Sequence, residues 1–383
     1  MQSPGMVVIG SGPAAVSAAE RFRQIDSHSP VTVVTADVHP PYQRPPLSKD
    51  FLRGDTDSVR LHDPDWFTKR SIRVLTDSPV HDIDLAHSVV HCAAEDFDYR
   101  TLVIASGAAP APLPVPGSDN AMLLRSLEDA TRLRDQARGA TTAVVIGAGF
   151  IGCEAAASLA SRGLSVTVVA PEESPQRGRL GEQAGKRILQ LLTDAGVHYI
   201  GGAEAHALES GVVHLDNGDT LRADMIVAAT GISPNNALAE AAGLAVHEGR
   251  ITVGADMATT AAGVYAAGDV ALADNATAQR PVPTEHWQDA IDQGALAGAA
   301  AAGQPGTWGA VPGFWTTIGE ATVKYSGWGG DFDNSYLIDH GDGFTVWYEA
   351  DGAAVGILTH NADTEYALGQ LLVAHRSRLP ARL

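Results

Sequence analysis

Two glycine-rich segments constrain the fold of this chain more than any other feature of its sequence. Residues 6–22 read MVVIGSGPAAVSAAERF, and residues 143–159 read AVVIGAGFIGCEAAASL. Each combines a β-branched run, a G-x-G-x-x-A/G turn and an alanine-rich helical stretch, and a second apolar strand follows at 31–37 and at 165–171. Glycines in such βαβ units let backbone N–H groups at a helix N-terminus approach a pyrophosphate. Two copies therefore predict two dinucleotide sites, and the alternative is two turns that serve only packing.

The residues that follow the second strand differ between the two copies. Asp37 follows it in the first copy, where a carboxylate can accept hydrogen bonds from an adenosine ribose. We interpret Ala170 as the corresponding position in the second copy, with Glu172 and Glu173 slightly beyond it. Arg177 and Arg179 could contact the 2′-phosphate of NADPH or belong to a solvated loop. The sequence thus leaves NADH and NADPH both open.

Composition and charge exclude several classes of protein. The chain has 383 residues, enough for two or three domains, and a net charge of −19, which makes nucleic acid and anionic membranes poor partners. No apolar run is long enough to cross a bilayer and the N-terminus lacks the features of a signal peptide, so a cytoplasmic location is expected. Two cysteines, Cys92 and Cys153, cannot form a zinc site alone, and we expect neither a metal site nor a disulfide framework.

Three more strand-like runs end in residues that can contact a ligand. Within residues 101–110 and 225–234 an apolar strand is followed by Ala-Ser-Gly and by Ala-Thr-Gly, and residues 263–270 place Asp269 directly after Gly268. Asp269 could bind a ligand or cap the helix that follows it.

Together these motifs resemble the FAD-dependent pyridine-nucleotide oxidoreductases that have two dinucleotide-binding domains. The segment PPYQRPPLSK (40–49) narrows the resemblance to the ferredoxin-reductase branch, which includes putidaredoxin and rubredoxin reductases and, more distantly, apoptosis-inducing factor. The resemblance implies an α/β fold with a glutathione-reductase-like layout of two Rossmann-like domains. It implies an FAD-binding domain (1–112 and 237–305), an NAD(P)-binding domain (113–236) and a C-terminal α+β domain (306–383).

The resemblance also implies which residues bind the two cofactors. Asp269 would bond the ribitol of FAD, and the helix that starts within 283–290 would stabilise negative charge on reduced flavin. The residues that it assigns to FAD are Gly10, Gly12, Pro13, Ala14, Ala15, Asp37, Arg44, Lys49, Val80, Ala105, Ser106, Gly107, Arg125, Gly268, Asp269, Glu285, His286, Trp287 and Trp315. Those that it assigns to NADH or NADPH are Gly147, Gly149, Phe150, Ile151, Gly152, Glu154, Arg177, Arg179, Thr230 and Gly231.

A catalytic pair, Lys49 and Glu154, follows from the same resemblance. Lys49 comes after Pro45 and Pro46, whose rings restrict the backbone. It is similar to a family lysine at the flavin edge near N5, which pairs with a glutamate of the nicotinamide domain. A fixed cation there would favour reduced flavin and help to orient the nicotinamide. The alternative is a surface lysine and a helix-face glutamate that never meet.

The implied activity is an NAD(P)H:ferredoxin reductase, which passes electrons through FAD to a ferredoxin-type iron–sulfur protein that could serve an oxygenase. A homodimer is compatible with this reading. Because no cysteine lies within 42–51, the thiol relay of disulfide reductases is not expected. One alternative is an NAD(P)H oxidase or quinone reductase, and another is a redox-sensing flavoprotein, resembling apoptosis-inducing factor, that acts through partner binding.

Two stretches depart from the family pattern, and acceptor docking adds a further requirement. Ala111 stands where family members often carry arginine, and residues 311–329 keep Phe314 and Trp315 without the polar residues that usually follow. Trp315 could therefore stack on the flavin or lie in a core. An acidic ferredoxin would need a local basic patch, for which a run between residues 44 and 73 is the candidate, with a solvated loop as the alternative. The basic residues of this run are Arg44, Arg53, Arg60, Lys69, Arg70 and Arg73.

Overall fold

The computed structural model describes residues 4–93, 95–330 and 332–380 and divides into two compact units. Unit 1 comprises Met1–Gln43, Arg60–Ala109 and Ser233–Pro312. Unit 2 comprises Arg44–Val59, Pro110–Ile232 and Gly313–Leu383, so the segment that carries Lys49 groups with the second glycine-rich copy. Among the described residues, no helix is both long and apolar enough to cross a membrane.

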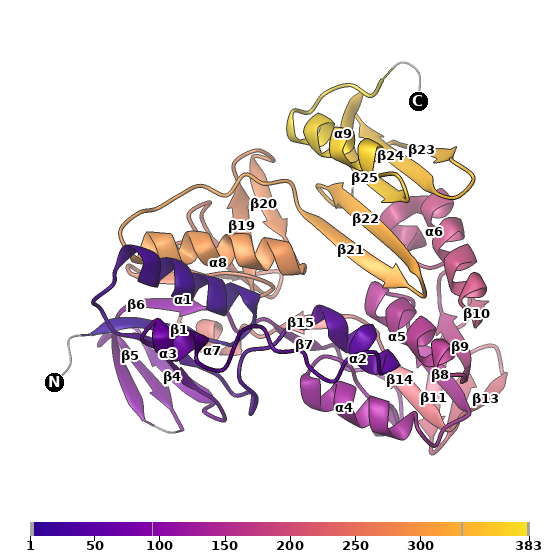
Figure 1. The fold of residues 1–383 in the computed structure, drawn as a ribbon, viewed down its shortest axis with the longest axis horizontal. Helices are drawn as coiled ribbons and strands as arrows, with labels where there is room; N and C mark the ends of the chain where they lie inside the picture. Colours follow the sequence, from indigo (N-terminus) through magenta and orange to yellow (C-terminus); the bar gives the residue numbers. More distant parts are fainter. Residues whose placement is uncertain (1–3, 94, 331, 381–383) are drawn as a thin grey trace. The chain divides into compact units, whose positions relative to one another are not determined.

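Unit 1 is built on a seven-stranded sheet whose central strands are parallel (Figure 1). Strand β1 lies between β2 and β6, and β18 pairs with the far edge of β6, so the first copy and the strand that ends at Ala266 share one sheet. The antiparallel strands β4 and β5 extend the sheet beyond β6. The strands of this sheet are β1 (Gly5–Ile9), β2 (Val31–Val34), β3 (Ile72–Leu75), β4 (Val80–Asp84), β5 (Val89–Cys92), β6 (Asp96–Ile104) and β18 (Val264–Ala266).

Two helices of unit 1, α1 (Pro13–Ile25) and α8 (Trp287–Ala301), pack side by side (Figure 1). A Cβ atom on Gly294 or Gly298 would lie 2.2 Å from a backbone oxygen of α1, so only glycine allows this close approach. The remaining elements of unit 1 are α3 (Trp66–Lys69), α7 (Ala237–Ala241), β16 (Val246–His247), β17 (Arg250–Val253), β19 (Ala271–Asn275) and β20 (Arg280–Pro283). Strands β7 (Ala108–Pro110) and β15 (Ile232–Pro234) form a separate two-stranded sheet.

The part of unit 2 that contains the second glycine-rich copy has a parallel four-stranded sheet in the order β10-β9-β8-β14. Strands β8, β9 and β14 are largely buried and rich in β-branched residues, as is typical of a parallel sheet covered on both faces. Its elements are η1 (Pro45–Ser48), α2 (Asp50–Arg53), η2 (Ser118–Asn120), α4 (Leu127–Gln136), β8 (Thr142–Ile146), α5 (Phe150–Ser161), β9 (Ser165–Ala170), α6 (Arg177–Asp194), β10 (Val197–Gly201), β11 (Ala205–Glu209), β12 (Val212–Leu215), β13 (Thr220–Arg222) and β14 (Met225–Ala228).

The C-terminal part of unit 2 is an antiparallel five-stranded sheet with one helix packed against it. The strand order is β21-β22-β25-β24-β23, and α9 contacts β22 and β25. The elements are β21 (Gly313–Ile318), β22 (Ala321–Gly327), β23 (Asn334–Asp339), β24 (Phe344–Ala350), β25 (Ala353–His360) and α9 (Asp363–Ala374). The observed fold is therefore α/β, with two Rossmann-like sheets and a C-terminal α+β part, as the sequence predicted.

Candidate active site

The glycine-rich turn of unit 1 has the backbone shape that a dinucleotide site requires. Gly10 has a φ of +114°, and a Cβ atom there would lie 2.1 Å from the carbonyl oxygen of Ala105. Gly12 is the N-cap of α1, has no side chain to occupy the helix N-terminus, and would place a Cβ in open space. The first N–H groups of the helix are thus accessible to an anion, and the turn fits the pyrophosphate of FAD.

Asp37 lies three residues beyond β2 and is oriented by its own neighbours. Its Oδ1 accepts a hydrogen bond from the backbone N–H of His39 at 3.0 Å, and its Oδ2 accepts one from the Tyr42 hydroxyl at 2.8 Å. Each carboxylate oxygen has a second acceptor position. The half-buried carboxylate can therefore still accept hydroxyl groups of a ribose.

Two side chains that sequence reasoning missed hold the turn around Asp269. Arg250 donates to the Asp269 carbonyl oxygen and forms an ion pair with Glu285 at 2.5 Å. Gln293 is fully buried, accepts from the Gly268 N–H at 2.9 Å and donates to the Thr284 hydroxyl at 3.1 Å. These contacts connect Gly268 and Asp269 to the N-terminal end of α8. No local motif marks them, because the partners lie 9 to 35 residues apart in sequence.

The predicted FAD residues are divided between the two units. His286 is the N-cap of α8 and Trp287 is its first residue. Trp315 is 44% exposed, which excludes the alternative of a core tryptophan. Unit 1 holds Gly10, Gly12, Pro13, Ala14, Ala15, Asp37, Val80, Ala105, Ser106, Gly107, Gly268, Asp269, Glu285, His286 and Trp287, and unit 2 holds Arg44, Lys49, Arg125 and Trp315.

The glycine-rich turn of unit 2 repeats the geometry of unit 1 with tighter packing. Gly147 has a φ of +104°, and a Cβ atom there would lie 2.4 Å from the Ala229 carbonyl oxygen. A Cβ atom on Gly152 would lie 2.2 Å from the Gly147 carbonyl oxygen, so the third glycine lets α5 approach its own turn. Gly149 is the N-cap of α5 and leaves the helix N-terminus accessible. The turn fits a second pyrophosphate.

Strand register corrects the expected counterpart of Asp37. Val34 pairs with Ile9 in unit 1, and Val169 pairs with Ile146 in unit 2. Three residues beyond these strand residues lie Asp37 and Glu172, so the interpretation of Ala170 as the counterpart of Asp37 was wrong. Comparison of the two strand sequences misled because the residue at which each strand ends is visible only in the sheet.

Glu172 is fixed by the segment that follows it. Its Oε1 accepts the Gly178 backbone N–H at 2.8 Å, and its carbonyl oxygen accepts the Tyr199 hydroxyl at 2.8 Å. Arg177 is exposed and lies 3.7 Å from Glu182, and the Arg179 guanidinium lies 5.7 Å from the centre of the Phe314 ring. The side chain in the ribose position is thus a carboxylate, with both arginines beyond it.

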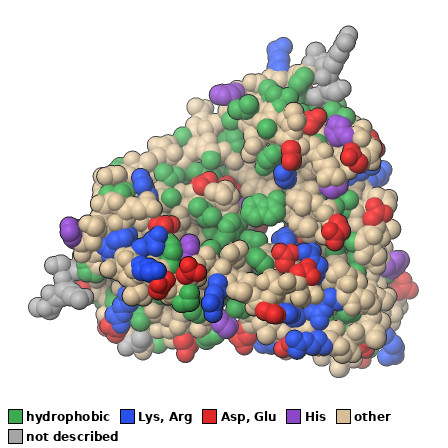
Figure 2. Space-filling model, in the orientation of Figure 1, with side chains coloured by type: hydrophobic (Ala, Val, Ile, Leu, Met, Phe, Trp, Pro, Cys, Tyr) green, Lys and Arg blue, Asp and Glu red, His purple; other side chains and the backbone are tan. Residues whose placement is uncertain are grey.

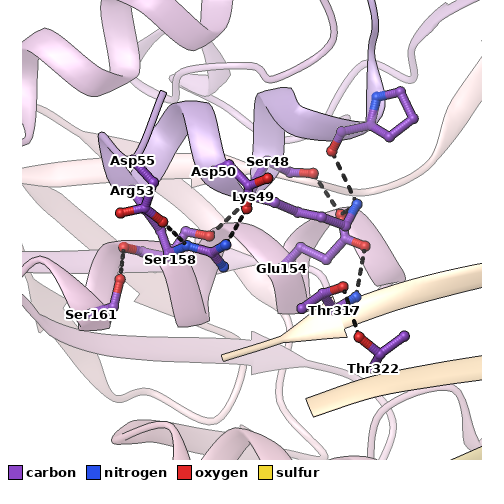
Figure 3. Close-up of polar contacts among 11 residues, drawn as sticks. Ser48, Lys49, Asp50, Arg53, Asp55, Glu154, Ser158, Ser161, Thr317 and Thr322 are labelled. Carbon is purple, nitrogen blue, oxygen red and sulfur yellow. Dashed lines mark hydrogen bonds and ion pairs between the residues drawn. The ribbon is translucent and has the colours of Figure 1, made fainter. Parts of the chain in front are cut away.

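Lys49 and Glu154 form a buried ion pair in unit 2, which excludes the alternative in which they never meet (Figure 3). The Lys49 Nζ lies 2.7 Å from Glu154 Oε2, and the two side chains are 12% and 5% exposed. Lys49 also donates to the Pro45 carbonyl oxygen at 3.1 Å. An ammonium group has three N–H donors, so the pair leaves capacity for one further acceptor.

Local structure explains why Lys49 reaches α5. Pro45 and Pro46 begin the 3₁₀ turn η1, and the Lys49 N–H donates to the Pro46 carbonyl oxygen at 3.0 Å. Ser158, one helical turn beyond Glu154 on α5, donates its hydroxyl to the Ser48 carbonyl oxygen at 2.7 Å. The same face of α5 therefore binds both the backbone and the lysine of this turn.

Two hydroxyl groups complete the environment of the Glu154 carboxylate. The Ser48 Oγ donates to Oε2 at 2.5 Å, and the Thr316 Oγ1 donates to Oε1 at 2.7 Å. The backbone N–H of Thr317 lies 3.4 Å from the same Oε1. Thr316 comes from β21, so the C-terminal sheet contributes directly to this site. Sequence reasoning missed Ser48 and Thr316, although the Pro-Pro turn already pointed to the segment that contains Ser48.

Neither cysteine provides a redox pair beside this site. Cys92 lies in unit 1 and Cys153 in unit 2, and both are free and buried. Burial, with the negative charge of Glu154 beside it, raises the pKa of the Cys153 thiol far above its ordinary value. The thiol is therefore neutral and a poor nucleophile.

Several basic residues of the expected docking patch (residues 44–73) form ion pairs with acidic side chains. Arg53 pairs with Asp55 at 2.8 Å, Lys69 with Asp65 at 2.5 Å, and Arg73 with Glu95. On the face drawn in Figure 2, basic and acidic side chains are interspersed. A solvated, charge-balanced run is the better description of these residues.

Comparisons with known proteins identify the family of this chain. The model of the "Pyridine nucleotide-disulphide oxidoreductase" family matches residues 4–294. Apoptosis-inducing factor 3 of Mus musculus is 32% identical over 375 residues, which cover 94% of this chain but only 61% of that protein. The chain thus spans less than two thirds of that relative's length.

Two relatives match over most of both chains. Rhodocoxin reductase of Rhodococcus erythropolis is 33% identical over 335 residues, covering 84% of this chain and 78% of that protein. The putidaredoxin reductase of the covalent putidaredoxin reductase–putidaredoxin complex superposes with a TM-score of 0.93 at 27% identity, covering 98% of this chain and 94% of that one. These findings confirm the predicted resemblance and fold class, and they imply FAD and a pyridine nucleotide as cofactors. The chain belongs to the pyridine nucleotide-disulphide oxidoreductase family.

Proposed function

We propose that this protein is an NADH-dependent FAD enzyme that delivers electrons to a ferredoxin-type iron–sulfur protein. The observation that carries the proposal is the buried ion pair between Lys49 and Glu154, and Glu154 lies on the helix that begins at the second glycine-rich turn. A charge pair shielded from water in this way is costly to bury and is a candidate for a functional role. The cofactor sets and the domain boundaries predicted from the sequence belong to the same proposal.

Lys49 and Glu154 would act by holding a fixed positive charge near the nicotinamide end of the NADH site. Glu154 keeps the ammonium in one position, and the hydroxyls of Ser48 and Thr316 keep the carboxylate in one rotamer. A preorganised cation stabilises negative charge that develops beside it and costs no reorganisation during the reaction. When bound, FAD supplies the conversion from the two electrons of a hydride to the single electrons that an iron–sulfur cluster accepts.

The preference for NADH is supported by Glu172. Its carboxylate occupies the position of Asp37 in the other unit, where it can accept ribose hydroxyls and repels a 2′-phosphate. Replacement of Glu172 with alanine should weaken NADH binding roughly tenfold and improve NADPH binding, because one charge-assisted hydrogen-bond acceptor is lost. A variant that keeps the wild-type ratio of the two apparent dissociation constants would contradict this assignment.

An iron–sulfur acceptor is supported by the names of two relatives that match over most of their length, a rhodocoxin reductase and a putidaredoxin reductase solved with putidaredoxin. The rival idea of a redox-sensing protein resembling apoptosis-inducing factor is not favoured, since the chain spans only part of the relative with that name. Direct transfer to oxygen or a quinone is the remaining alternative, and it would need no docking protein.

The proposal is tested by anaerobic stopped-flow reduction of the FAD-loaded protein with NADH and with NADPH, followed by cytochrome c reduction with and without an added [2Fe–2S] ferredoxin. We expect rapid flavin bleaching by NADH and cytochrome reduction that depends on the ferredoxin. Equal cytochrome or quinone reduction without ferredoxin would favour the oxidase or quinone-reductase alternative. A flavin that neither nucleotide bleaches would reject the reductase.

A further inference from the structure

The segment that follows Glu172 is held in an unusual conformation by the C-terminal sheet. Helix α6 is interrupted at Gly181, which has φ 82° and ψ 168°, so its first turn (177–180) is separate from the rest. Gln176 precedes this turn with a left-handed φ of +60°. A left-handed conformation is uncommon for residues other than glycine, and contacts with the surrounding structure must stabilise it.

Tyr348 supplies part of that support. Helix α6 is broken at Gly181, directly after Leu180, and the Tyr348 hydroxyl donates to the Leu180 carbonyl oxygen at 2.9 Å. Tyr348 lies on β24, is 2% exposed, and burial raises its pKa well above the ordinary value, so the hydroxyl keeps its proton. A buried carbonyl oxygen without a donor would carry a desolvation penalty.

Phe332 supports the same kink from the side. Its ring lies 4.9 Å from the Tyr348 ring, and its Cζ would be 3.2 Å from a Cβ atom on Gly181. Helix α6 also contacts β23 of the C-terminal sheet. The sheet therefore packs against the place where the helix departs from regular geometry.

The opposite end of the segment is bonded to the dinucleotide site itself. Gln176 donates from Nε2 to the carbonyl oxygen of Ala148, which lies between the first two glycines of the second turn, at 3.2 Å. The Gly178 N–H donates to Glu172 Oε1 at 2.8 Å, where a Cβ on residue 178 would lie only 2.7 Å away. The position of this short turn thus fixes the carboxylate assigned to the adenosine ribose.

We propose that Tyr348 is a positioning residue for the adenosine half of NADH, acting through Leu180, the first turn of α6 and Glu172. The inference rests on the proposed NADH site and adds that the C-terminal sheet shapes it. Tyr348 does not touch the nucleotide. It holds the turn in which the Gly178 N–H donates to Glu172, the side chain that contacts the ribose in this proposal.

Calorimetric titration of the FAD-loaded protein with ADP-ribose and, separately, with nicotinamide mononucleotide tests this proposal in wild type and in Tyr348→Phe. We expect ADP-ribose to bind roughly tenfold more weakly to the variant, because without this hydrogen bond the first turn of α6 no longer holds Glu172 in its binding position, and mononucleotide binding to change less than twofold. In steady state, KM for NADH should rise while kcat is preserved. Tyr325→Phe is the matched control, since Tyr325 is also buried, lies two strands away, and its loss of a hydroxyl leaves the Tyr348–Leu180 hydrogen bond in place.

The outcomes separate this inference from the function on which it rests. Wild-type protein that binds neither ADP-ribose nor NADH would reject the proposed function. Wild type that binds ADP-ribose, with an equal dissociation constant in Tyr348→Phe, would overturn the role of Tyr348 alone, as would an equal loss for both half-ligands. If Tyr348→Phe does not fold, Gly181→Ala gives the second measurement. This substitution strains the same kink at Gly181 itself, and it should weaken the binding of ADP-ribose but not that of nicotinamide mononucleotide.

Discussion

The two glycine-rich units use the same backbone and different side chains. In unit 1 the Gly10 N–H donates to the Val34 carbonyl oxygen at 2.8 Å, and in unit 2 the Gly147 N–H donates to Val169 at the same distance. Both glycines have a φ above +100°. The turns are alike because a pyrophosphate is recognised by N–H groups, which every residue except proline carries.

The helices that follow the turns differ in what they contact. The fifth residue of α1 is Ser17, whose hydroxyl donates to the Ile291 carbonyl oxygen of α8 at 2.8 Å. The fifth residue of α5 is Glu154, which binds Lys49 and Thr316. The same position in the motif therefore serves packing in one unit and a buried charge pair in the other. A shared backbone device fixes where a nucleotide can bind, and the neighbouring elements decide what else occurs there.

The largest effect is expected when the first glycine of either turn, Gly10 or Gly147, is replaced, because this tests whether the two turns bind separate ligands. Gly10→Ala and Gly147→Ala each place a Cβ atom within 2.4 Å of a backbone oxygen in a conformation that alanine avoids. We expect Gly10→Ala to lose FAD while it still binds ADP-ribose, and Gly147→Ala to keep FAD but lose ADP-ribose. Flavin absorbance and calorimetry measure the two sites. Loss of both ligands in both variants, with native circular dichroism, would contradict separate sites.

The next largest effect concerns the fifth helical position. Glu154→Gln should destabilise the protein by about 3–5 kcal/mol, because a buried ammonium loses its charged partner. Ser17→Ala, at the matching position, should cost about 1 kcal/mol, the typical contribution of one hydrogen bond. Urea unfolding followed by circular dichroism gives both values, and flavin reduction by NADH should slow only in Glu154→Gln. Equal losses of stability would refute the contrast between the two helices.

A smaller effect is expected at the contact from the C-terminal sheet. Thr316→Val removes the hydroxyl that donates to Glu154 and should slow flavin reduction several-fold, whereas Thr316→Ser keeps the donor and should restore most of the rate. Single-turnover stopped flow measures the rate, and the visible spectrum of bound flavin reports its environment independently. If the valine and serine variants have the same reduction rate and the same flavin spectrum, the Thr316 hydroxyl has no role in the reaction and Thr316 only packs.

The smallest effect is expected at Asp224, on the edge of the unit 2 sheet. Hydrogen bonds from the backbone and side chains of Thr141 and Thr142 lower the pKa of this carboxyl to about 2 from 3.8. The folded-state pKa is depressed, so the stabilisation is fully present above pH 3.8 and is lost as the pH falls through about 2. Thermal unfolding of Asp224→Asn should show a lower Tm than wild type at pH 7, with the gap closing at lower pH. A gap that stays constant down to pH 2 would contradict this linkage.

Much of the site was predicted because its determinants are local. The two turns, their helices and the acid after β2 all lie within continuous stretches, where steric limits on the backbone restrict the fold. The pairing of Lys49 with Glu154, 105 residues apart, was expected only from the family resemblance. The end of each strand could not be predicted reliably, because an apolar run is compatible with several end points and pairing with the adjacent strand selects one of them.

Two glycine-rich turns, an α/β fold and the absence of a cysteine pair near Lys49 could all be predicted from the order of the amino acids. Tertiary structure alone decided that Ser48 and Thr316 share the Glu154 carboxylate, that Gln293 holds Gly268, and that Tyr348 holds the first turn of α6. The difference lies in how far apart the interacting residues are in the sequence. Backbone conformation is set by neighbours along the chain, whereas the partner of a buried polar group is whichever donor packing brings within hydrogen-bond distance.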